Sequence, residues 1–304
     1  MMVNNRGSVR GLLRWQRENV VWSAFAASIV VLVYKLHVLD VIPRLFTLPT
    51  MPVAVVGGAI GIFVSFRTNS AYDRWWEGRK LWGRLINTSR HFSTQVLSWI
   101  GRHDGPEANH LVRRHIAYVH TLRCLLRTED PFEDTDVRAF LTEEELAGLR
   151  GKSNTTHAIL HLQHLDFTTW ADAHDLDPRR LQQLDESVRH LLDIQGGCER
   201  IKKTPLPRGY GYIAEQLIRY YAWLLPLAIV EDLHILTIPM NVLICLSFSL
   251  ISEAGRVLED PFTMFWNGLP LTAMSKTIEN DLRSRMGEVD LPPVPGPDAD
   301  GILM

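Results

Sequence analysis

The chain has 304 residues, of which 46% are hydrophobic and 22% are charged, and its formal net charge is −2. This length allows one or two domains, and the near-neutral charge gives no argument for a nucleic-acid partner. The three cysteines are far apart and have neither disulfide nor metal-site spacing, so we expect buried free thiols.

Hydrophobic residues are concentrated in two regions, and four segments in them have the character of membrane-spanning helices. The first two are long and largely uncharged, whereas the last two are short or interrupted by proline, which a membrane helix tolerates. The last two are joined by little more than two acidic residues and therefore form a hairpin. Buried helices of a soluble bundle are the alternative. The segments are residues 20–42, 50–66, 217–230 and 233–252.

Basic residues predict the orientation of these spans. Cytoplasmic flanks of membrane helices are enriched in Lys and Arg. Such residues precede the first and third spans and follow the second and fourth, whereas the opposite loops contain only Lys35 and Arg44, or Glu231 and Asp232. We therefore expect a multi-pass protein of the inner membrane with both termini in the cytoplasm. The basic residues are Arg6, Arg10, Arg14, Arg17, Arg67, Arg74, Arg79, Lys80, Arg84, Lys202, Lys203, Arg208 and Arg256.

The polar region between the second and third spans has helical spacing of its apolar residues and little β-type alternation, so we predict an all-α protein. Polar capping residues predict a helix start at 153–156, and Pro178 predicts another. We expect "GGCERIKKTPLPRGYG", residues 196–211, to break the helical structure. The predicted organisation is an N-terminal arm with two spans (1–66), a cytosolic helical region (67–212), two further spans (213–252), a C-terminal helical segment (253–286) and a disordered tail (287–304).

The second span continues without a helix breaker into "VVGGAIGIFVSFRTNSAYDRWWEGRKLWGRL", residues 55–85. Its glycines allow close helix packing, within one subunit or around a symmetric pore. Gly58, Ile62 and Phe66 share one face, where a ring of apolar side chains could form a constriction that closes by dewetting. Spacing alone favours ordinary core packing over such a constriction.

Two further groups of residues are candidate metal sites. His157, His161 and His164 share a helix face, where a pair of imidazoles can chelate a metal, but exposed histidines are the simpler interpretation. The acidic residues of 129–136 lack calcium-loop spacing, so we expect a solvated acidic turn. The sequence contains no nucleophile elbow, phosphate loop or zinc-protease motif, so we expect no enzyme.

Four segments together resemble the bestrophin family, specifically its bacterial branch. The first is "SFRTNSAYDRWWEGRKLWGRL" after the second span, the next two are "GGCERI" and "TPLP" before the third span, and the last is "LEDPF" after the fourth span, with "LPL" following it. The resemblance implies a homopentameric ion channel with one central pore, four membrane helices per subunit and a cytosolic helical vestibule. Its partners would be further copies of this chain, the lipid membrane and monovalent ions.

The resemblance also implies the functional residues. It assigns an apolar pore neck to Gly58, Ile62 and Phe66, with Gly58 leaving the outer ring wide. It assigns a cytosolic aperture to Leu176, with Arg179 as the alternative.

The family's eukaryotic members are calcium-activated chloride channels whose calcium clasp includes an acidic run. Here only Glu259 and Asp260 remain of that run, because "TMFW" follows Pro261–Phe262 and Gly268 stands where an acid is common. We therefore expect no cofactor and no calcium activation through this site.

Bacterial relatives conduct monovalent cations, so we expect sodium and potassium to pass, with chloride as the alternative. A membrane-anchored scaffold or sensor that binds a cytosolic ligand or partner is the hypothesis from another class.

Overall fold

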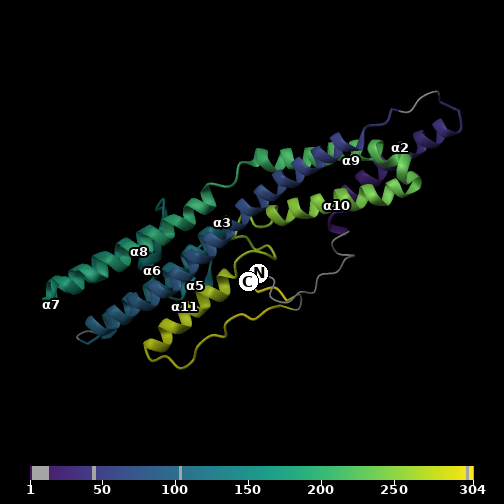
Figure 1. Cartoon of the computed structure of the whole chain (residues 1–304). Helices are drawn as coiled ribbons and strands as arrows, with labels where there is room; N and C mark the ends of the chain where they lie inside the picture. Colours follow the sequence, from purple (N-terminus) through teal and green to yellow (C-terminus); the bar gives the residue numbers. More distant parts are fainter. Residues whose placement is uncertain (2–13, 43–45, 103–104, 299–300, 304) are drawn as a thin grey trace. The chain divides into compact units, whose positions relative to one another are not determined.

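The structure is a computed structural model, and it describes residues 1, 14–42, 46–102, 105–298 and 301–303. Arg6, Arg10 and Arg44, which contributed to the predicted orientation, lie outside the described residues. The regular elements of the described part are helical (Figure 1). They are α2 (Arg17–Val38), α3 (Thr50–Trp99), α4 (Gly105–Arg127), α5 (Thr135–Arg138), α6 (Glu143–Leu149), α7 (Thr155–His174), α8 (Pro178–Lys203), α9 (Arg208–Leu233), the 3-10 turn η1 (His234–Leu236), α10 (Thr237–Arg256) and α11 (Leu271–Arg285).

The chain divides into two compact units. The apolar unit comprises Asn5–Trp75 and Pro205–Glu259, and the polar unit comprises mainly Trp76–Thr204 and Asp260–Met304. Helix α3 contributes its first half to the apolar unit and its second half to the polar unit.

In the apolar unit, helices α2, α9 and α10 pack against one another (Figure 1). Val30 and Val31 of α2 contact Val230 of α9, and Val64 of α3 belongs to a core cluster with Leu225 of α9 and Cys245 of α10. Among the described residues, three stretches are long and apolar enough to cross a membrane: Arg17–Val38, Thr50–Trp99 and Gly209–Arg256. The third stretch contains α9 and α10, which the short turn η1 joins as a hairpin.

The predicted helix break at 196–211 is wrong in its first half. Helix α8 continues through Gly196 and Gly197 to Lys203, and the chain leaves helical geometry only over Thr204–Pro207. The reason lies in packing, because a Cβ atom on Gly197 would stand 2.8 Å from Leu81 of α3. The glycine permits close contact between two helices rather than ending one.

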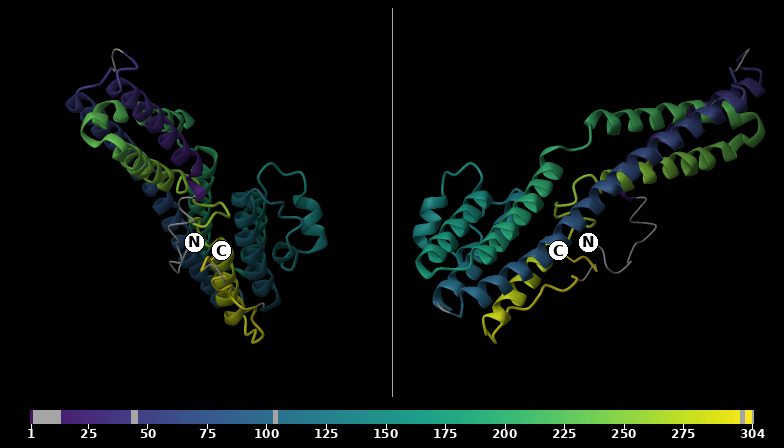
Figure 2. Two further views of the ribbon diagram at one scale, coloured as in Figure 1. Left: turned by 90° about the vertical axis from the view of Figure 1, so that its right-hand side faces the viewer. Right: turned by 60° about the vertical axis from the view of Figure 1, so that its left-hand side comes forward.

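The polar unit is built around large side chains with no solvent exposure, among them Trp82, Phe92, Tyr118 and Phe167 from α3, α4 and α7. Helix α7 begins after Asn154, whose side chain caps it, and α8 begins at Pro178, as the sequence predicts. Figure 2 shows the teal helices α4 to α8 gathered together and the yellow helix α11 beside the second half of α3.

The three cysteines are free and buried, as their spacing predicted. Burial raises the pKa of Cys124 and of Cys198 to about 12, so both thiols stay protonated and unreactive at neutral pH. Residues 288–298 form no helix, and Asn280 and Arg283 of α11 bond Pro292 and Glu288. The predicted disorder of 287–304 stays a prediction.

Candidate functional site

The first half of α3 has two faces of different character. The face turned toward α9 and α10 buries Val53, Ile60 and Val64 at spacings of about two helical turns and one turn. On the opposite face, Ile62 is 61% exposed and Phe66 is 70% exposed, and Gly58 is exposed beside them. The three residues predicted for the neck therefore lie together on an uncovered apolar face, outside the core of the chain.

The neighbouring glycines serve two different purposes. A Cβ atom on Gly57 would stand 2.5 Å from the hydroxyl oxygen of Tyr221, so this glycine lets α9 approach α3 closely. A Cβ atom on Gly58 would meet nothing within 4 Å. Gly57 is needed for packing within one chain, whereas packing within the chain gives no reason for glycine at position 58.

The basic character of α3 begins with a side chain that points into the protein. Arg67 is only 7% exposed and donates hydrogen bonds to Ser252 at 3.0 Å and to Glu259 at 2.6 Å. Arg74 donates to the backbone carbonyl of Glu259 at 2.6 Å. Arg67, directly after Phe66, and Arg74, about two turns further along α3, thus fix the segment after α10 to α3. Arg67 is not part of the exposed face.

The two carboxylates that remain at the position of the family's calcium clasp are already paired with cations. Glu259 forms the ion pair with Arg67, and Asp260 lies 2.8 Å from the ammonium nitrogen of Lys202. A calcium ion needs several oxygen ligands free of competing cations. The residues present do not fit such a site, since a basic side chain neutralises each carboxylate.

The residues predicted for the aperture lie where α7 turns into α8. Asp175 ends α7 in the left-handed conformation with φ at 50°, and the carboxylate of Asp177 accepts a hydrogen bond from the backbone of Arg179 at 2.8 Å. Leu176 is half-buried, and the Arg179 side chain is exposed with no ion pair to any described residue. Both residues thus occupy the tip of this helical hairpin.

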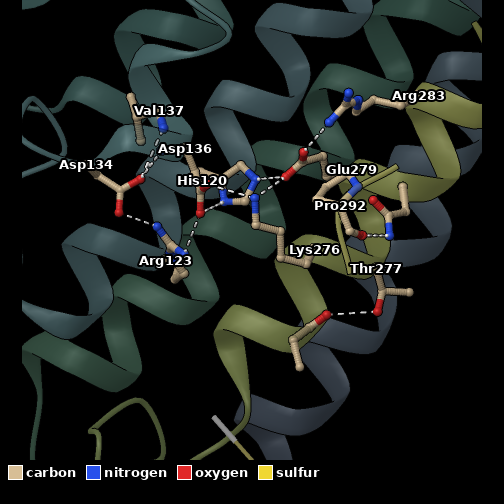
Figure 3. Close-up of polar contacts among 12 residues, drawn as sticks. His120, Arg123, Asp134, Asp136, Val137, Lys276, Thr277, Glu279, Arg283 and Pro292 are labelled. Atoms are coloured by element: carbon tan, nitrogen blue, oxygen red, sulfur yellow. Dashed lines mark hydrogen bonds and ion pairs between the residues drawn. The ribbon is translucent and has the colours of Figure 1, made fainter. Parts of the chain in front are cut away.

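The structure also contains a buried ionic network that sequence reasoning missed (Figure 3). His120 on α4 is fully buried and lies 3.0 Å from Glu279 on α11, itself 2% exposed. Lys276 reaches Glu279 at 2.8 Å and Asp136 at 2.7 Å. Because a carboxylate only accepts hydrogen bonds, the Nε2 atom of His120 carries the proton. The network joins α4 and the turn before α5 to α11.

Electrostatics in this network favour the charged forms. Burial alone would raise the pKa of Glu279, but hydrogen bonds from His120 and Lys276 outweigh it and lower that pKa to about 2. Burial likewise opposes the charge of Asp136, yet Lys276, His120 and Arg123 together lower its pKa. Glu279 and Asp136 are therefore ionised at neutral pH, and both carboxylates face the charged Lys276.

The prediction of a solvated acidic turn is wrong for two of its residues. Asp134 and Asp136 both pair with the buried Arg123, whereas Glu129, Asp130 and Glu133 are exposed as expected. Residues 120, 136 and 279 are far apart in sequence, so no local pattern could reveal the pairing. The only available signal was the presence of Arg and His on the otherwise apolar helix 111–126.

Candidate metal ligands are few in the described part of the chain. Ligand atoms of Glu107, His110 and Asp166 lie within 4.8 Å of one another, but Arg114 donates to Asp166 at 2.5 Å and so places a competing cation there. His157 and His161 are exposed, and His164 lies 3.6 Å from Asp185. The three histidines do not come together with a set of acidic ligands among the described residues.

Comparison with known proteins agrees with this geometry. Residues 5–284 match the family model described as Bacterial/Fungal Bestrophin protein. The chain is 30% identical to the voltage-dependent anion channel-forming protein YneE of Escherichia coli (strain K12), over 93% of this chain and 95% of that protein. It is 31% identical to the voltage-dependent anion channel-forming protein RSc3414 of Ralstonia nicotianae, with the same coverage of 93% and 95%.

Solved structures are equally similar. A crystal structure of a bacterial bestrophin homologue from Klebsiella pneumoniae matches with a TM-score of 0.82 and 29% identity, covering 90% of this chain and 98% of that one. A variant of the same homologue matches with a TM-score of 0.83 and 30% identity, covering 93% and 100%. Motifs, fold and relatives agree, and the chain belongs to the bacterial and fungal bestrophin family.

Proposed function

We propose that this protein is a bestrophin-type channel of the bacterial inner membrane, a homopentamer that passes monovalent ions through a neck formed by Gly58, Ile62 and Phe66. The exposed apolar face of α3 carries this proposal. Ile62 and Phe66 are more than half exposed in a single chain, on a helix whose opposite face buries Val53, Ile60 and Val64. In a ring of subunits around a central axis, this face would line the pore.

A neck of this composition acts by size and wetting rather than by charge. Rings of Ile and Phe side chains offer water and ions no hydrogen-bond partner, so a narrow neck of this kind conducts only when it is wet. Gly58 adds no side chain to the outer ring, which leaves the outer end wider. Arg67, directly after Phe66, is paired with Glu259 and contributes little field to the neck.

The charge preference must then arise outside the neck. The tip between α7 and α8 carries three exposed aspartates against two exposed arginines, Arg179 and Arg180. If this tip lies along the exit path, its acidic excess favours cations. We propose cation preference, for sodium and potassium, on this basis and on the family resemblance. The aspartates are Asp172, Asp175 and Asp177.

An anion channel is the second candidate. Two relatives that align with nearly the whole chain are named as anion channel-forming proteins. The Arg179 guanidinium, exposed and without an ion pair among the described residues, is the group that would attract chloride if it lined the aperture in place of Leu176.

The reversal potential separates the two candidates. Purified protein is placed in a planar bilayer with a KCl gradient across it. We expect reversal near the potassium equilibrium potential; reversal near the chloride potential would establish the anion channel and make Arg179→Gln the next variant. No current from protein shown to be a folded pentamer would favour a membrane-anchored scaffold or sensor for a cytosolic partner.

We also propose that calcium does not open this channel, since Glu259 and Asp260 are both neutralised by basic partners. Currents should be the same in excess chelator and in millimolar calcium. Activation by calcium that Asp260→Asn abolishes would contradict this and show that the ion displaces Lys202 from its partner.

A further inference from the structure

A polar cavity of about 300 Å³ lies in the apolar unit where α2 begins and α10 ends, beside residues 215–219 of α9. Three helices contribute to its wall, with Arg17 and Glu18 from α2, Glu215 and Arg219 from α9, and Arg256 from α10. These helix ends are the ones predicted to face the cytoplasm, so the cavity would lie at the level of the inner-leaflet headgroups.

Only two of the described charged side chains that line this cavity pair with each other. Glu253 and Arg256 form an ion pair on α10. By contrast, Arg17, Glu18 and Arg219 form no ion pair and no side-chain hydrogen bond with any described residue. Glu215 likewise has no ion pair in the described chain. Two cations and two carboxylates therefore remain available to a ligand that carries both signs of charge.

A buried hydroxyl in the wall also lacks a partner. Ser249 is 4% exposed and lines the cavity, and its Oγ atom has no hydrogen-bond partner in the described chain. A buried polar group without a partner is costly, and it is commonly satisfied by a bound molecule. The hydroxyl can donate to a phosphate oxygen, which is the group that the arginines favour.

The cavity continues onto an aromatic surface. A second cavity of about 220 Å³ shares Glu18, Asn19 and Arg219 with the first and adds Trp22. Trp22 and Phe25 are 42% and 52% exposed, and both contact Trp223 of α9 with ring centroids 6.0 and 6.3 Å away. Aromatic rings of this kind favour the membrane interface. A ligand with a charged head and apolar chains would occupy both the polar cavity and the aromatic surface. A free metabolite would occupy the polar cavity alone.

We infer that this cavity binds the headgroup of a zwitterionic phospholipid, a phosphodiester bearing a primary ammonium group. Arg17 and Arg219, with the Ser249 hydroxyl, hold the phosphate, and Glu18 and Glu215 hold the ammonium group. The acyl chains lie along Trp22 and Phe25. This inference rests on the proposed membrane location but not on which ion the channel passes.

Native mass spectrometry of the detergent-purified full-length protein tests the site. Protein stripped of lipid is titrated with phosphatidylethanolamine, with phosphatidylglycerol, with free phosphoethanolamine and with inorganic phosphate. We expect saturable binding of phosphatidylethanolamine in preference to phosphatidylglycerol. The double variant Arg17→Gln/Arg219→Gln should weaken this binding about tenfold, as expected for lost charge-assisted hydrogen bonds.

Matched variants make the result specific. Lys35→Gln removes a cation from the other end of α2 and should leave binding unchanged. Glu215→Gln should abolish the preference for phosphatidylethanolamine over phosphatidylglycerol while phosphate binding persists. If the double variant misfolds, Ser249→Ala and Glu215→Gln are each measured alone, and both should weaken binding of phosphatidylethanolamine.

Several outcomes would overturn the inference. The double arginine variant could still bind phosphatidylethanolamine as the wild type does, or the wild type could bind both lipids equally. Either result would show that the cavity does not recognise a zwitterionic headgroup. Free phosphoethanolamine binding as tightly as the intact lipid would show a site for a soluble ligand instead. Lipid binding without ionic current would contradict the proposed channel and leave this site intact.

Discussion

At the scale of single residues, His115 shows how strongly burial can control ionisation. It is 1% exposed on α4, neither ring nitrogen has a hydrogen-bond partner in the described chain, and its neighbours include the rings of Phe92 and Tyr118. Burial lowers the pKa of His115 from 6.5 to about 3. The imidazole is therefore a neutral core side chain rather than a proton carrier.

The acid stability of the protein should reflect this histidine. Below pH 6.5, His115 is protonated in the unfolded chain but stays neutral in the folded chain. His115 therefore lowers the stability of the folded state progressively as the pH falls from 6.5 toward about 3. His115→Phe should therefore flatten the decline of the apparent melting temperature in detergent between pH 6.5 and pH 4. The exposed His161→Phe is the control, and an equal slope in the His115 variant and the wild type would contradict the assignment.

The glycine pair on α3 gives a second prediction at this scale. Gly57→Ala adds a methyl group 2.5 Å from the Tyr221 hydroxyl oxygen, which should cost about 1–3 kcal/mol of stability through overpacking. Gly58→Ala meets no atom within 4 Å of the chain and should not destabilise it. Apparent melting temperatures of the two variants check this, and a Gly57 variant as stable as the wild type would show that α9 can yield at this contact.

At the scale of elements, the ionic network explains how a short polar helix is held in place. Helix α11 has 15 residues and mostly charged or small side chains outside its buried stripe, yet Glu279 and Lys276 tie it to α4 and to the turn before α5 (Figure 3). Removing one partner of such a buried set leaves the others uncompensated, which costs more than the pair itself contributes.

Glu279→Gln should therefore destabilise the protein by about 3 kcal/mol at neutral pH. The folded pKa of about 2 lies below the usual value of 4.5, so the stabilisation is present above pH 4.5 and is lost as the pH falls toward 2. The difference in apparent melting temperature between variant and wild type should shrink over that interval. Asp281→Asn on the same helix breaks the partly exposed pair with Arg90 and should cost less than about 1 kcal/mol. Equal effects of the two substitutions would argue against the network.

At the scale of the whole molecule, the features that the sequence predicts are those set by residues close together in the chain. The apolar stretches and the starts of α7 and α8 follow from runs of similar residues and from capping side chains. Spacing alone also places Ile62 and Phe66 on one face of the helix, but it favours core packing for that face. In the structure, α9 and α10 pack against the opposite face of α3, and the face with Ile62 and Phe66 is left uncovered. The course of α8 through Gly197 and the pairing of His120 with Glu279 depend on contacts distant in sequence.

The uncovered face of α3 is also the feature that connects one chain to its proposed assembly. The side chains that pack inside the chain and those that would line a pore alternate along the same helix, so Gly57 and Gly58, adjacent in sequence, face different demands. A single-channel recording tests the proposed pore-lining role directly, because the conductance depends on the width and wetting of the neck.

The central claim is therefore tested by single-channel conductance in planar bilayers for the wild type, Ile62→Ala and Phe66→Ala. Leu32→Ala, an exposed apolar position on α2, is the control. We predict that both neck variants conduct several-fold more than the wild type, because smaller side chains widen the neck and let it stay wet, and that the control is unchanged. Unchanged conductance in both neck variants, from protein of unchanged assembly state, would show that this face of α3 does not form the neck.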